Sequence, residues 1–281
     1  MGGKRWAGLP RSWHPLVRRV HALHRSLAVA LAIFWGFFFY GLIDLLAFAQ
    51  GPDFHQNLLL STGWGLLFLF LVAAPLFAVA TRPAAVTPAA LGLVAAAALA
   101  VTAGAAASGS AKHLVVAAGL AATAAVVAWS GGGSRSAWPW DWRPAALPIS
   151  LVVLAVPPGL AYWWDSARAT NTNLATDVTA GLDHWPIQAA LPIALILGAT
   201  VAAGHPQGWR LPSWCVGSAT AWLAVLSFLE PGLPGSLGQA WAAITLLWAV
   251  CFLAAVQCSG LHARPSRRRN GRRPSSPTSK S

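Results

Sequence analysis

The sequence predicts an all-α membrane protein, a polytopic bundle of about eight transmembrane helices with both termini in the cytoplasm. Three observations predict it: eight apolar stretches of bilayer-crossing length, a charged content of only 9% beside 56% hydrophobic residues, and basic residues that fall almost entirely in alternate connections. An ordinary soluble domain contains roughly 25% charged residues. A spanning helix needs roughly 20 apolar residues, because lipid offers no partner to an open backbone and a helix pairs its own peptide groups.

The predicted spans follow one another within a bundle over residues 26–258. They cover residues 26–50, 58–80, 84–107, 112–130, 145–164, 184–203, 211–229 and 237–257. The third and fourth spans are rich in small residues, so we expect them to pack as a tight hairpin with closely approaching backbones. The fifth span contains Pro157 and Pro158 and is expected to bend or break in its outer third, because proline removes a backbone donor and clashes with the preceding turn.

The two ends of the chain are strongly basic. Of the 19 Lys and Arg residues, six lie within residues 1–25 and seven from Arg264 onward, in a chain of net charge +12. Residues 1–25 are predicted to form an amphipathic segment on the lipid surface. Residues 259–281, rich in Arg, Ser and Pro, are predicted to be disordered. Because both tails flank spans, their predicted partner is a surface of anionic lipid headgroups and not nucleic acid.

The distribution of basic residues predicts the topology. With the N-terminus inside, 17 Lys and Arg residues lie on the inner side and two, Lys112 and Arg168, on the outer side. The positive-inside rule therefore places both termini in the cytoplasm. The preference for Arg over Lys and the abundance of Ala are typical of a GC-rich bacterial genome, which makes the bacterial cytoplasmic membrane the expected location. Residues 47–49 resemble a signal-peptide cleavage site, but the preceding apolar stretch exceeds the roughly 7–15 residues of a signal-peptide core, which favours an uncleaved first span over the cleaved alternative.

Asp44 is the one acidic residue within a predicted span. Counted from the outer end of that span at 1.5 Å per residue, it lies ~8 Å below the interface. An ionisable residue at this depth is a functional hypothesis by default, and the alternative is a structural hydrogen bond to a neighbouring helix or to water. In either case an isolated charge is costly, so Asp44 is predicted to contact His184, His55 or Lys112.

Several further polar residues are predicted at the outer face, all near helix ends. With Asp44 they form the candidate site: Asp53, His55, Lys112, Asp183, His184 and Glu230. Converging carboxylates and imidazoles can bind a divalent metal, relay protons or hold a cationic substrate. The alternative is local: Asp183 precedes Pro186 by three residues, as an N-cap does, and Glu230 precedes a Pro-Gly pair that ends a helix. The outer loop 165–183 is read either as a polar lid or as a solvated connector.

The sequence carries no HExxH, GxSxG or GxxxxGK[ST] motif, and its three Cys residues lack metal-ligand spacing. No mid-span His suggests haem, so neither a metal nor another cofactor is expected. Three classes of function remain. The first is a small transporter or an accessory subunit with a membrane-protein partner, the second is a membrane-embedded enzyme with an outer His/Asp site, and the third is a purely structural protein. Substrate and oligomeric state are left open by the sequence.

Overall fold

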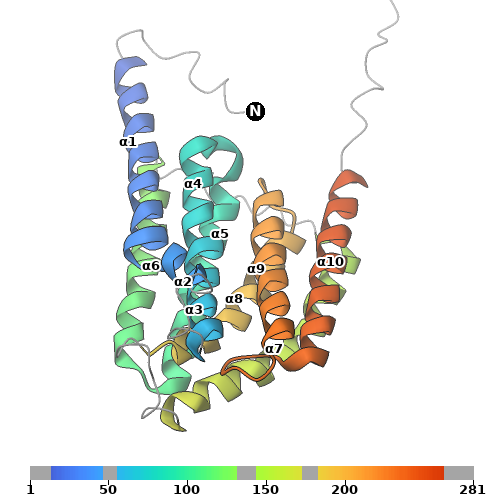
Figure 1. Ribbon diagram of the computed structural model, residues 1–281. Coiled ribbons are helices and arrows are strands. Elements are labelled where there is room, and N and C mark those ends of the chain that lie inside the picture. Colours follow the sequence, from blue (N-terminus) through green and yellow to red (C-terminus); the bar gives the residue numbers. More distant parts are fainter. Residues whose placement is uncertain (1–13, 47–55, 132–143, 173–182, 263–281) are drawn as a thin grey trace, which may run out of the picture.

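The computed structural model describes residues 14–46, 56–131, 144–172 and 183–262. Every regular element in these ranges is helical, and eight helices are long and apolar enough to cross a membrane, which confirms the predicted helical fold and its eight candidate spans. The start of helix α1 (His14–Ile33) and the end of α10 (Gly238–His262) lie at the same end of the bundle (Figure 1). We call the opposite end, where α5 (Pro83–Ser108) ends and α8 (Trp185–Ala203) begins, the distal end.

The first two spans are assembled from several helical pieces. The first contains α1, the π-helix η3 (Phe34–Phe38) and α2 (Gly41–Leu45). The second contains α3 (Leu58–Gly65), the π-helix η6 (Leu66–Ala73) and α4 (Ala74–Thr81). Each later span is a single helix, namely α5, α6 (Ala111–Ser130), α7 (Ala146–Thr172), α8, α9 (Arg210–Leu229) and α10.

The second, third and sixth spans form the centre of the bundle. Most of their residues are buried, whereas α7 is the least buried span and α1, α6 and α10 also lie at the periphery. These outer helices expose large apolar side chains, including Val115 at 73%, Leu154 at 68% and Leu247 at 64%. Extensive exposed apolar surface of this kind is typical of helices that face a membrane or another protein.

Small residues set the closest helix contacts. α5 and α6 are joined through Gly109 and Ser110 and pack along each other, which confirms the predicted hairpin. α5 also packs tightly on α8, because a Cβ added at Gly104 would lie 2.3 Å from the carbonyl oxygen of Pro186. The centre of the bundle is therefore fixed where helix backbones touch without intervening side chains.

The first span differs from the continuous helix predicted over residues 26–50. α1 begins at His14, continues through the described part of the predicted amphipathic segment, residues 14–25, and widens into η3 before the helix stops. Tyr40 then has a left-handed backbone with φ of 63°, and α2 follows. Glycine is required at position 41, because a Cβ there would lie 2.9 Å from the carbonyl oxygen of Trp35.

The break predicted in the fifth span is absent. α7 continues through Pro157 and Pro158. These residues have no N–H, so the carbonyl groups of Val153 and Leu154 cannot receive their usual helical hydrogen bonds. Transmembrane helices tolerate such prolines where neighbouring helices support them. α8 gives that support, since a Cβ at Gly159 would lie 2.6 Å from a side-chain atom of α8.

Candidate functional site

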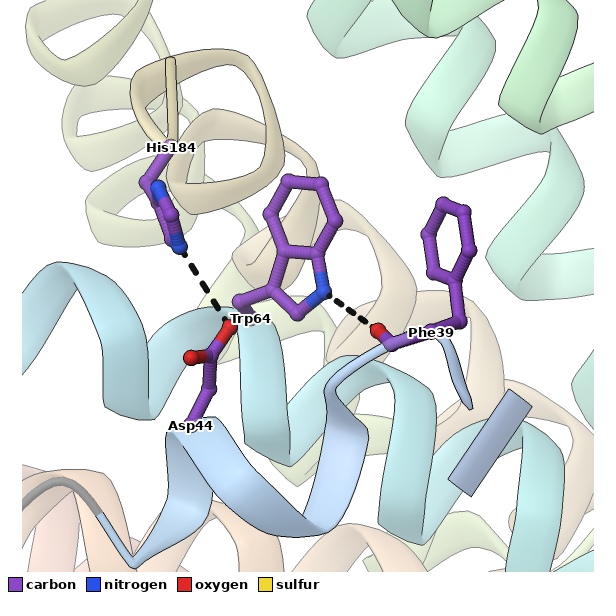
Figure 2. A network of polar contacts seen from close by, with 4 residues as sticks. All are labelled: Phe39, Asp44, Trp64 and His184. Atoms are coloured by element: carbon purple, nitrogen blue, oxygen red, sulfur yellow. Dashed lines mark hydrogen bonds and ion pairs between the residues drawn. The ribbon is translucent and has the colours of Figure 1, made fainter. Parts of the chain in front are cut away.

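Asp44 and His184 meet inside the bundle (Figure 2). The Nε2 atom of His184 lies 3.4 Å from the Oδ2 atom of Asp44, and the two side chains are 4% and 15% exposed. The contact predicted for Asp44 is therefore present, with His184 as its partner. The pair joins α2 of the first span to the start of α8, the sixth span.

The break in the first span positions Asp44. The left-handed Tyr40 redirects the chain, and α2 then packs against α3, where a Cβ at Gly65 would lie 2.5 Å from the Leu45 nitrogen. The indole N–H of Trp64 donates a hydrogen bond of 3.0 Å to the carbonyl oxygen of Phe39 (Figure 2). This bond satisfies an acceptor at the break, where a carbonyl would otherwise face an apolar interior.

His184 occupies the N-cap position of α8 and makes no side-chain cap bond. The backbone carbonyl oxygen of His184 accepts a hydrogen bond of 2.9 Å from the backbone N–H of Gln188, which is the first hydrogen bond of the helix. Trp64 packs against the imidazole with ring centroids 4.8 Å apart. The Nδ1 atom of His184 is buried and has no hydrogen-bond partner among the described residues. The ring therefore faces a carboxylate on one nitrogen and keeps the other available for a proton or a water molecule.

His113 adds a second buried imidazole. Its side chain is 2% exposed, its Nδ1 atom lies 2.7 Å from the Ser110 hydroxyl, and it hydrogen-bonds the backbone of Asp183. Trp64 lies near both imidazoles, with its ring centroid 6.2 Å from that of His113. His113 directly follows Lys112, which was predicted as a site residue. The structure buries His113 and leaves Lys112 exposed.

The other predicted site residues lie at different places in the chain. Asp53 and His55 lie outside the described residues. Asp183 is 8% exposed with φ of 56° and stands one residue before the cap position, which His184 takes, so the predicted N-cap is displaced by one residue. Glu230 is the C-cap of α9, in agreement with its interpretation as a helix end. The loop predicted over 165–183 begins as helix, because α7 extends to residue 172.

The described residues contain no group of three or more His, Cys, Asp or Glu side chains placed to hold a metal ion. A structural or catalytic metal usually takes three or four such protein ligands. The Asp44–His184 contact by itself supports ion pairing and proton exchange, because a carboxylate and an imidazole can share a proton.

A second polar network begins one helical turn along α8. Gln188 is fully buried, and its side-chain amide donates a hydrogen bond of 2.5 Å to the Tyr162 hydroxyl of α7. That hydroxyl donates a bond of 2.5 Å to the carbonyl oxygen of Gly235, between α9 and α10. Sequence reasoning missed these residues, although the spacing of four between His184 and Gln188 places both on one helix face.

The chain matches no protein-family model, no curated protein and no solved structure.

Proposed function

We propose that this chain is a small membrane transporter whose conformational cycle is coupled to protonation of the Asp44–His184 pair. One observation carries the proposal: the His184 Nε2 to Asp44 Oδ2 contact of 3.4 Å between two largely buried side chains from different spans. Ionisable residues inside membrane bundles face the interior, pair with one another and mark proton and ion pathways. Trp64 lies beside both His184 and His113, so the pair has other polar side chains near it within the bundle.

The proposed coupling follows from the charge of the pair. With one shared proton the pair is electrically neutral, so it is compatible with a site of little water. Loss of this proton leaves the Asp44 carboxylate facing a neutral imidazole, and gain of a second leaves a net positive charge. Either change penalises the buried arrangement, because a buried charge without a partner is costly. α2 follows the left-handed Tyr40 and is five residues long, so it is the element expected to move away from α8.

We further infer the orientation from the 17 to two distribution of basic residues. Both termini face the cytoplasm of a bacterial plasma membrane, and the distal end faces outward. The Asp44–His184 pair then lies toward the outer half of the bundle. This position suits a site that exchanges protons with the outer side.

Current measurements on proteoliposomes adsorbed to a solid-supported membrane test the proposal without knowledge of the substrate. A rapid drop in external pH drives protons onto a buried site and displaces charge across the membrane. The full chain should give a saturable transient current. Asp44→Asn and His184→Gln, which cannot titrate, should remove it, while Glu230→Gln, a charge removal at the end of α9, should leave it unchanged.

Thermal unfolding of the detergent-purified variants confirms that each is folded before the currents are compared. If the wild type gives no transient current, or if Asp44→Asn gives the same current, the pair is a structural contact. The accessory or purely structural role then takes precedence over transport.

A further inference from the structure

A pocket of about 810 Å³ lies among α7, α8, α9 and α10, and its lining includes neither Asp44 nor His184. We call it the α7–α10 pocket. Ligand pockets are typically about 300–1,000 Å³. α7 packs mainly on α8, and α10 mainly on α9, so that the space between α7 and α10 remains open. α9 and α10 stand side by side in orange and red in Figure 1.

Hydrogen bonds fix the aromatic walls of this pocket. Tyr162 is held by Gln188 and by the carbonyl oxygen of Gly235. The indole N–H of Trp248 donates a bond of 2.8 Å to the carbonyl oxygen of Leu151, and its ring stacks on Phe252 at 5.0 Å. These contacts tie α7 to α10 and to the loop before it. The bonds fix the positions of Tyr162 and Trp248, so two aromatic walls of the pocket are preorganised for a ligand.

The ionisable and acceptor groups at the pocket favour positive charge. Asp165 supplies the one carboxylate of its described lining, and no Lys, Arg or His lines it. Arg168, the nearest cation along α7, stacks over Trp164 at 4.6 Å and is not a lining residue. The lining Thr220 is 4% exposed, and its hydroxyl has no hydrogen-bond partner among the described residues.

Backbone and aromatic groups add to this preference. The lining residue Pro158 has no N–H, so the carbonyl oxygen of Leu154, which also lines the pocket, loses its helical donor. Backbone carbonyls without their helical donors attract cations in membrane proteins. Tyr162 and Trp241 also line the pocket, and an aromatic ring can attract a cation through its quadrupole.

We infer that the α7–α10 pocket binds an amphipathic organic cation, with its apolar body between the helices and its positive charge toward Asp165. An anion would face the Asp165 carboxylate, and a neutral chain would leave this carboxylate without a counter-charge. The claim that this cation is the transported substrate rests on the proposed function. The claim that the pocket binds it does not, and binding is measured separately.

The probe is radiolabelled tetraphenylphosphonium, and binding is measured by scintillation proximity on the full chain in an uncharged maltoside detergent. We expect saturable binding. Methyltriphenylphosphonium and triphenylphosphine oxide have the same shape and differ in charge, so the cation should displace the probe at about tenfold lower concentration than the neutral compound.

Matched variants locate the site. Asp165→Asn should weaken binding of the probe about tenfold, whereas Glu230→Gln, which removes a carboxylate outside the pocket, should leave it unchanged. Ala155→Phe fills the pocket and should abolish binding, whereas Ala125→Phe places the same bulk on the exposed face of α6 and should not.

Absence of saturable binding overturns the inference, as does equal competition by the neutral compound or wild-type affinity in Asp165→Asn. Asp44→Asn separates the two proposals, because it should remove the pH-jump current and retain phosphonium binding. A protein that binds the cation but gives no pH-jump current supports the pocket and contradicts the coupling.

Discussion

Substitution of Gly65 by alanine tests whether the packing of α2 on α3 holds the ion pair together. A Cβ at this position would lie 2.5 Å from the Leu45 nitrogen and 2.8 Å from the Gly41 carbonyl oxygen, where ordinary contact begins at 3.4 Å. Both neighbours are backbone atoms of α2, so the whole helix must retreat by about 1 Å. The Asp44–His184 distance, now 3.4 Å, should then exceed the range of a hydrogen bond.

We expect Gly65→Ala to lower the free energy of unfolding by about 1–3 kcal/mol, as overpacking does. Reversible unfolding in mixed detergent and dodecyl sulfate micelles measures this change. The same variant should also reduce the pH-jump current, because it displaces Asp44 without removing its carboxylate.

Gly119→Ala on α6 is the matched control. A Cβ there would lie 3.4 Å from the Cη2 atom of Trp35, an ordinary contact, and alanine favours a helix interior over glycine by about 0.5–1 kcal/mol. The same chemical change should therefore be neutral or stabilising at Gly119 and destabilising at Gly65. If Gly65→Ala unfolds like the wild type and keeps its current, α2 does not depend on the contact with α3 and the reasoning is refuted.

Three other predictions concern the break, the topology and the C-terminal tail. Trp64→Phe removes the N–H that donates to the Phe39 carbonyl oxygen and should cost about 1–3 kcal/mol in the same unfolding assay, and an unchanged stability would show that another donor replaces it. A reporter fused after Ser281 should report the cytoplasm and one inserted after Thr172 the outer side, and the reverse pattern would contradict the topology. A peptide of residues 261–281, which lie mostly outside the described residues, should bind anionic vesicles weakly at high salt and strongly at low salt, with binding independent of lipid charge as the contrary outcome.

Hydropathy was sufficient to predict the eight helices, because the length of an apolar stretch is set by the bilayer and not by the partners of the helix. That Asp44 has a polar partner was predictable for a related reason, since a buried carboxylate must be paired, although the sequence left His184, His55 and Lys112 as alternatives. Both predictions depend on properties of the lipid bilayer, namely its thickness and its low polarity.

The remaining features depend on tertiary contacts that a sequence does not display. The first span breaks at Tyr40 without a proline, where Trp64 supplies a donor from another span. α7 continues through Pro157 and Pro158, because α8 supports it. The α7–α10 pocket is formed by residues of four helices. Hydropathy describes each helix separately, so no local sequence pattern predicts the pocket.

The break at Tyr40 also affects how the first span is anchored. The continuous stretch Arg19–Phe38 has 20 residues, which at 1.5 Å per residue rises about 30 Å, the thickness of the hydrocarbon core. By length alone this stretch matches the hydrocarbon core, and α2 continues the same span as a separate helical piece after Tyr40. A shift of α2 therefore leaves the length of this 20-residue stretch, and its match to the bilayer thickness, unchanged. The segment that bears Asp44 can thus change its position while the membrane anchor of the same span stays where it is.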